Sequence, residues 1–173
     1  PSIAMNVFFE DDGQLKAGAV LADNDSSLQV ESTTGKRIKV KAAAVLLRFA
    51  APSATTLHAE AHALAATLDV DFLWDVSGDD EFGFAELATE YFGHPPTAVE
   101  SAAVALALAG APMYFYKRGK GRYRKAPAEA LKAALASVER RKREAEQVER
   151  WVAELAQGRL PEALQAKTVA LLH

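Results

Sequence analysis

The sequence contains no cysteine among its 173 residues. A disulfide framework and thiolate metal sites are therefore excluded, and the composition fits a reducing compartment. Histidine is scarce as well, with four scattered residues that assemble no nucleophile, base and orienting acid. No Walker loop or dinucleotide fingerprint occurs either. We therefore predict that this chain carries no catalytic residue and binds no cofactor or metal.

The sequence also lacks any apolar run of about 20 residues, the length that a membrane-spanning helix needs. Its start has no basic segment followed by an apolar centre, as a secretory signal would. We therefore expect a cytoplasmic protein with no membrane partner. Residues 1–4 precede Met5, where the first apolar cluster begins, and we interpret them as a remnant outside the fold.

The net charge of −3 argues against indiscriminate binding to nucleic acid, but the charges are segregated along the chain. Residues 36–48 contain five basic side chains and no acid, and residues 69–90 contain eight acids and no base. Residues 113–125 then contain six basic side chains and no acid. The two basic stretches are the candidate contacts for a polyanion.

Residues 5–51 carry five short apolar clusters separated by turn signals, which predicts a small five-stranded SH3/OB-like β-barrel. In its fourth strand cations alternate with β-branched residues, so the cations share one face. That face is either a phosphate contact or the charged solvent side of an ordinary antiparallel strand. The basic residues concerned are Lys36, Arg37, Lys39 and Lys41.

Residues 52–126 are predicted to form a winged-helix-like (helix-turn-helix) domain. Helices are expected over 56–68, capped by Ser53 or Thr55, over 84–92, and over 98–109, with residues 72–76 as a short helix or strand. A basic hairpin follows. The helix over 98–109 is almost uncharged, so we do not expect it to read DNA bases.

Two groups in this region resemble metal sites only superficially. His58 and His62 share a helix face, but no third ligand is evident, and we expect ordinary surface or partly buried histidines. The acids at 79–81 are expected at a helix start, where carboxylates interact favourably with the helix dipole.

The basic hairpin at 113–125 interleaves aromatic residues with cations around two glycines. It predicts either an RNA-contacting wing or a solvated hairpin whose aromatic residues form its core face. If their rings face outward, Tyr116 and Tyr123 can stack on bases. The candidate phosphate contacts are Lys117, Arg118, Lys120, Arg122, Arg124 and Lys125.

Residues 127–173 are predicted to form a long helix ending near Gly158, followed by a short helical tail. Its middle mixes both signs of charge at spacings of three and four, as an exposed helix requires. A solvated face is expected there, with a basic contact by residues 140–143 as the alternative. The fold class is thus α+β, with a barrel, a winged-helix-like domain and a long C-terminal helix.

Four runs resemble the N-terminal region of a bacterial branch of the ribonuclease II (RNB) family of exoribonucleases, over residues 5–165. They are MNVFFEDDGQLKAGAVL, LQVESTTGKRIKVKAAAVLLRF, EFGFAELATEYFGHPPTAVESAAVALAL and APMYFYKRGKGRYRKAPAEALKAAL. The resemblance implies a parent enzyme that degrades RNA hydrolytically from its 3′ end. It also implies magnesium held by aspartates in a separate catalytic domain, whose aspartate cluster has no counterpart here.

The resemblance therefore implies an accessory fragment that binds or guides single-stranded RNA for its own catalytic domain and is not itself an enzyme. The alternative is a docking or oligomerisation module that makes no contact with RNA. In that case the acidic stretch at 69–90 and the basic hairpin should find each other or a protein partner.

Overall fold

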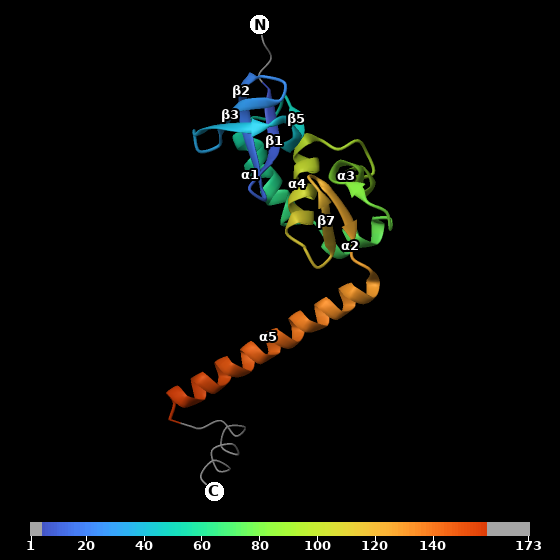
Figure 1. The fold of residues 1–173 in the computed structure, drawn as a ribbon. Helices are drawn as coiled ribbons and strands as arrows, with labels where there is room; N and C mark the ends of the chain where they lie inside the picture. The colour runs from blue at the N-terminus through green and yellow to red at the C-terminus, as the bar shows by residue number, and fades with distance from the viewer. Residues whose placement is uncertain (1–4, 159–173) are drawn as a thin grey trace. The chain divides into compact units, whose positions relative to one another are not determined.

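The computed structural model describes residues 5–158 (Figure 1). The chain divides into two compact units, residues 1–126 and residues 127–173. Within the described residues, the first unit holds two β-sheets and four α-helices, and the second holds one long α-helix. The α+β class expected from the sequence is confirmed.

A five-stranded antiparallel sheet begins the first unit. Its order is β4-β3-β2-β1-β5, so β5 returns to pair with β1 after a single turn of 3-10 helix, Ala42–Ala44. Within residues 5–158 no pairing joins β4 to β5, and the sheet is not shown to close. The strands are β1 (Asn6–Asp11), β2 (Gln14–Asp23), β3 (Ser27–Ser32), β4 (Arg37–Lys41) and β5 (Val45–Phe49).

Successive side chains of a strand point to opposite sides of the sheet. The first four residues of β1 are all buried, so both faces of this strand are covered. Val7 and Phe9 pack inside the sheet with Leu28 and other strand residues. Phe8 instead joins a second core that includes helical residues. The sheet and the helices therefore share a core within residues 1–126.

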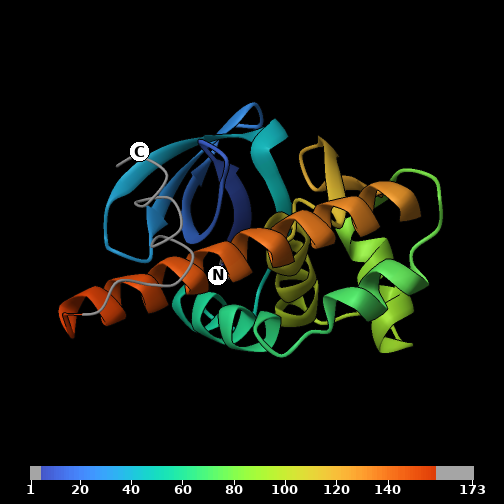
Figure 2. The same cartoon turned by 90° about the horizontal axis from the view of Figure 1, so that it is seen from below.

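Four helices follow in the first unit, and α1 packs beside α4 (Figure 2). Ser53 caps α1, since its Oγ accepts a hydrogen bond from the backbone N–H of Thr56 at 3.2 Å. Gly93 ends α3 in the left-handed conformation that favours glycine. The helices are α1 (Ala54–Ala65), α2 (Val70–Val76), α3 (Phe84–Phe92) and α4 (Ala98–Ala109).

The acids at 79–81 do not lie at a helix start, contrary to the expectation. Helix α3 begins at Phe84, after the short strand β6 (Phe82–Gly83). Glu81 and Asp79 instead reach cations of the basic hairpin. A tertiary contact therefore accounts for these acids better than the helix dipole does.

A reciprocal capping box begins α4. The Thr97 hydroxyl accepts the Glu100 backbone N–H at 3.1 Å, and the Glu100 carboxylate accepts the Thr97 backbone N–H at 2.9 Å. Replacing Thr97 by alanine is expected to lower the free energy of unfolding by about 1 kcal/mol, because a backbone donor loses its partner. Urea unfolding measures the change. Thr55→Ala is the control, since no hydrogen bond of the Thr55 side chain is found within residues 5–158; an equal change in both variants would contradict the prediction.

The basic hairpin predicted from the sequence is present as β7 (Phe115–Gly119) and β8 (Arg122–Lys125). Strand β6 pairs with β8, which gives a three-stranded antiparallel sheet in the order β6-β8-β7. The backbone N–H of Phe84 donates to the Gly121 carbonyl at 3.0 Å. This bond ties the hairpin turn to the start of α3.

The second unit holds helix α5 (Ala128–Ala156), which begins directly after Pro127. Its exposed middle carries both signs of charge, as expected. The short helical tail predicted after Gly158 lies outside the described residues. Among residues 5–158, no helix combines the length and apolarity that crossing a bilayer requires.

Candidate nucleic-acid interface

The hairpin turns one aromatic face into the core. Phe115 is 2% exposed and meets Phe82 edge to face, with ring centroids 6.0 Å apart. Tyr123 is 4% exposed, and burial raises the pKa of its hydroxyl. Tyr116 points the other way and is 42% exposed. Base stacking is therefore available to Tyr116 and not to Tyr123, because Tyr123 is a core residue.

Most hairpin cations contact the acidic stretch, as the docking alternative anticipated. Arg122 Nε lies 2.6 Å from Glu81 Oε2, and this hydrogen bond raises the pKa of the guanidinium. Arg118 Nε lies 4.0 Å from the other oxygen of the same carboxylate. Arg124 Nε donates to the Asp79 backbone carbonyl at 3.1 Å.

Lys117 in the middle of β7 and Lys125 at the end of β8 also have partners. Lys117 pairs with Glu10 of β1. Lys125 lies 3.9 Å from an Asp79 carboxylate oxygen, and its ammonium sits 4.3 Å from the centroid of the Trp74 ring. The Trp74 indole N–H donates to the Ala126 carbonyl at 2.9 Å. These contacts hold β7 against β1 and the end of β8 against α2.

The arginine pairs of the hairpin are open to solvent, since the partner side chains are roughly half exposed. Ion pairs that are this exposed to solvent contribute little to stability. A phosphate group can therefore replace a carboxylate at these guanidiniums with little loss. The acidic stretch therefore offsets part of the positive charge of the hairpin, and its arginines remain accessible to a phosphate.

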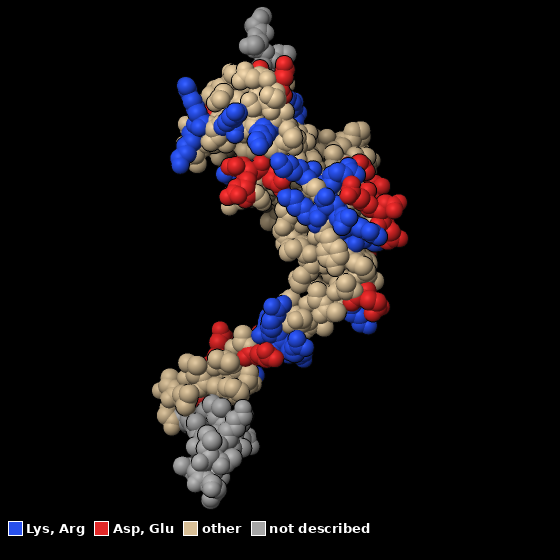
Figure 3. Space-filling model, viewed as in Figure 1, with Lys and Arg blue, Asp and Glu red and all other residues tan. Residues whose placement is uncertain are grey.

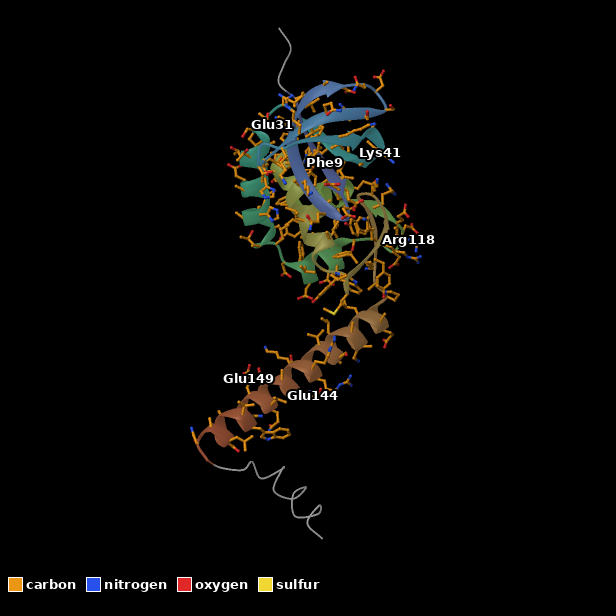
Figure 4. The ribbon with its side chains drawn as sticks, turned by 60° about the vertical axis from the view of Figure 1, so that its left-hand side comes forward. Phe9, Glu31, Lys41, Arg118, Glu144 and Glu149 are labelled. Atoms are coloured by element: carbon orange, nitrogen blue, oxygen red, sulfur yellow. The ribbon has the colours of Figure 1, made fainter. Side chains whose placement is uncertain are left out.

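Lys120, at the hairpin turn, makes no ion pair within residues 5–158. It lines a surface hollow of about 250 Å³ together with Lys39 and Lys41 of β4. We call this feature the three-lysine hollow. Figure 4 shows Lys41 and Arg118 along the same side of the first unit. Two basic stretches about 80 residues apart in the sequence thus meet in the fold.

The turn residue Gly121 helps to place Lys120 there. Its φ of +70° belongs to the left-handed region that favours glycine. A Cβ at this position would lie 3.0 Å from Phe84 Cδ1 and 3.1 Å from Leu46 Cδ2. The turn therefore packs against β5 and α3, which brings Lys120 toward β4.

Three carboxylates also line the three-lysine hollow, but two of them have partners elsewhere. Glu10 pairs with Lys117, and Asp11 pairs with Lys16 at 2.8 Å. Asp12 has no ion pair within the described residues. Lys39, Lys41 and Lys120 make no ion pair within residues 5–158, so their ammonium groups are available to an anion. Figure 3 shows basic side chains over the first unit with acidic side chains directly beside them.

The predicted cationic face of β4 is also present. Arg37, Lys39 and Lys41 are exposed, whereas Ile38 is half-buried and Val40 is buried. Lys36 precedes the strand and lines a separate cavity near α1. Of the four cations predicted in this segment, Lys39 and Lys41 therefore lie with Lys120 of the hairpin turn, whereas Lys36 lines a different cavity.

Sequence reasoning did not identify the acidic wall of the hollow or the Trp74 contact. In the sequence, the acids at 10–12 have the composition of an ordinary turn. They line the hollow only because the hairpin packs beside β1. Within residues 5–158, no group of three or more histidine or acidic side chains is arranged to hold a metal ion.

Comparisons with protein-family models, curated proteins and solved structures find no match to this chain.

Proposed function

We propose that this chain binds single-stranded RNA through the three-lysine hollow, the exposed cations of the hairpin and the ring of Tyr116. The observation that carries the proposal is the convergence of Lys39, Lys41 and Lys120 on one hollow. When lysines without carboxylate partners neutralise phosphates, the counterions condensed on the nucleic acid are released, and this release favours binding. The exposed ring of Tyr116 on β7 adds a stacking surface for a base, worth about 1–3 kcal/mol.

Single-stranded RNA is favoured over duplex DNA because α4 offers no reading surface. Six of its side chains are buried, and Glu100 is its only charged residue. A helix that reads the major groove needs exposed polar side chains for the base edges. Contact through the hairpin and β4 relies instead on phosphates and stacking, which suits an unpaired strand.

We further infer a finer architecture for the first unit, with a small SH3/OB-like barrel followed by a winged-helix-like domain. The return of β5 to β1 and the burial of both faces of β1 support the barrel. The order of α2, β6, α3, α4 and the β7–β8 hairpin supports the winged helix.

The family resemblance extends the proposal to a parent enzyme. We propose that the chain is the N-terminal region of a ribonuclease II family exoribonuclease and guides RNA to a catalytic domain outside this chain. The support is the resemblance of the four sequence runs. Magnesium would belong to that catalytic domain; the residues described here supply no ligand group for it.

The test is a titration of the chain with a fluorescently labelled oligouridine at several salt concentrations. In the variant with Lys39, Lys41 and Lys120 replaced by glutamine, we expect weaker binding. We also expect the slope of log affinity against log salt to shrink by about 2, since each phosphate contact on a single strand contributes about 0.7. Circular dichroism would verify that the variant is folded.

The matched control replaces Lys132, Arg140 and Lys142 of α5 by glutamine, which removes the same charge from the second unit. This control should keep most of the affinity and the salt slope. Equal losses in the two variants would indicate either unspecific attraction or the alternative basic contact at residues 140–143, and would count against the proposal. Absence of binding at low salt would also remove it.

A second candidate function is docking to a protein partner. Two observations favour it: hairpin arginines already pair with carboxylates, and α5 exposes apolar side chains. The exposed residues are Leu135, Val138, Val148, Val152 and Leu155. Sedimentation would reveal self-association, and a chain that self-associates while ignoring RNA would favour this function.

A further inference from the structure

A cavity of about 580 Å³ opens in the first unit beside the β1–β2 turn, and it shares no lining residue with the three-lysine hollow. Gly13 of that turn lines the cavity, and Asp12 lines the hollow. The remaining walls come from β2, the β3–β4 turn, α1 and α4. Its volume lies within the range of about 300–1,000 Å³ that is typical of small-ligand sites.

One wall of the cavity is apolar. It is lined by Leu15 and Ala17 of β2, Ile38 of β4 and Leu106 of α4. Ala17 is buried and belongs to the core that the sheet and the helices share. Because this wall is part of the packed core, it offers a flat ligand an ordered apolar surface.

Two imidazole rings form the next part of the lining. His58 and His62 occupy successive turns of α1, with ring centroids 4.4 Å apart and planes inclined by 58°. Burial, and secondly the neighbouring His62, lower the pKa of the His58 ring. A neutral imidazole stacks on a heteroaromatic ring without the cost of desolvating a charge.

The opposite rim is polar and cationic. The hydroxyls of Ser32 and Thr34 are hydrogen-bonded at 2.9 Å, and Ser32 Oγ also accepts the Lys36 backbone N–H at 3.2 Å. The Lys36 side chain has no ion pair within residues 5–158, whereas Lys16 pairs with Asp11. None of the residues that line the cavity, all within the described part of the chain, is acidic. The lining therefore suits an anion that carries a flat apolar group.

We propose that this cavity binds a single nucleotide, with its base against the His58 and His62 rings and its phosphate at Lys36. The apolar wall covers the second face of the base, and the Ser32 and Thr34 hydroxyls lie on the rim beside the phosphate. A free mononucleotide and a nucleotide of an RNA strand share this chemistry. The site does not depend on RNA binding at the three-lysine hollow.

The test is a titration of the full chain with adenosine monophosphate, followed through the ring proton signals of the histidines by NMR. We expect the signals of His58 and His62 to shift, while those of His94, which lies outside the cavity, stay constant. Adenosine should bind more weakly, and inorganic phosphate alone should leave the rings unchanged. A short RNA that acts at lower concentration than the mononucleotide would identify a strand as the source, and the reverse would identify the free nucleotide.

The variant Lys36→Gln should weaken binding of adenosine monophosphate about tenfold, as expected for the loss of a charge-assisted hydrogen bond, and leave adenosine binding unchanged. Lys36→Arg should restore most of the affinity. Lys36 is exposed in a turn, so both variants are expected to fold, and circular dichroism checks this.

The glutamine variant of the three-lysine hollow separates this site from the proposed RNA surface. It should bind adenosine monophosphate as the unaltered chain does, even where its RNA affinity is lost. The proposal is overturned if the mononucleotide leaves the His58 and His62 signals unmoved, or shifts His94 equally. It is also overturned if the hollow variant loses the mononucleotide while Lys36→Gln retains it.

Discussion

Replacing Phe115 by alanine is expected to lower the free energy of unfolding by about 3–5 kcal/mol, the usual cost of emptying a buried phenylalanine site. The ring is almost completely buried and contacts Phe82 edge to face. Its loss removes both the transfer free energy and this aromatic contact. Denaturant unfolding of the variant and the unaltered chain measures the difference.

The neighbouring variant Tyr116→Ala serves as the control, because that ring is exposed on the opposite face of the same strand. It should change stability by only a few tenths of a kcal/mol, as surface substitutions usually do. If the two variants were equally stable, or if Tyr116→Ala were the more destabilised, the assignment of the core face of the hairpin would be wrong.

Replacing Gly121 by alanine is expected to lower the free energy of unfolding by about 2–4 kcal/mol. Two effects combine here: a non-glycine residue at φ +70° is strained, and the new Cβ would press on Phe84 and Leu46. Because this turn positions Lys120, relief of the crowding should also move that lysine away from β4. RNA affinity should then fall together with stability.

Gly119→Ala provides a control within the same hairpin. A Cβ there would meet only Arg122 Cβ, at an ordinary distance of 3.9 Å, and the backbone is not in the left-handed region. The control should retain both stability and RNA affinity. A Gly121→Ala chain as stable as the Gly119→Ala chain would show that the turn is not packed as described.

The strands and helices were predictable where local chemistry decides them. Turn residues separate the five N-terminal strands, and Gly93 ends α3. The apolar stripe over 84–92 also predicted the bounds of α3, but the role of the acids before it was not predictable in the same way. The acids at 79–81 have the composition of a helix start, yet their positions follow from guanidiniums about 40 residues later in the chain. Local patterns do not contain that information.

The site was predictable in its parts and not in its assembly. Charge counting identifies β4 and the hairpin as basic, but only packing brings Lys39 and Lys41 to Lys120. Alternation along β7 and β8 separates the aromatic residues into two faces without indicating which face is the core. For Tyr116 and Tyr123 this distinction decides whether the ring can reach a base.

The contact of Lys125 with Trp74 makes the indole an optical probe of the hairpin. The chain has two tryptophans, and the other, Trp151, lies in α5. A Trp151→Phe background would confine indole fluorescence to the first unit. An ammonium 4.3 Å from the ring centroid affects the emission of that ring, so a ligand that draws Lys125 away alters the signal without any attached dye.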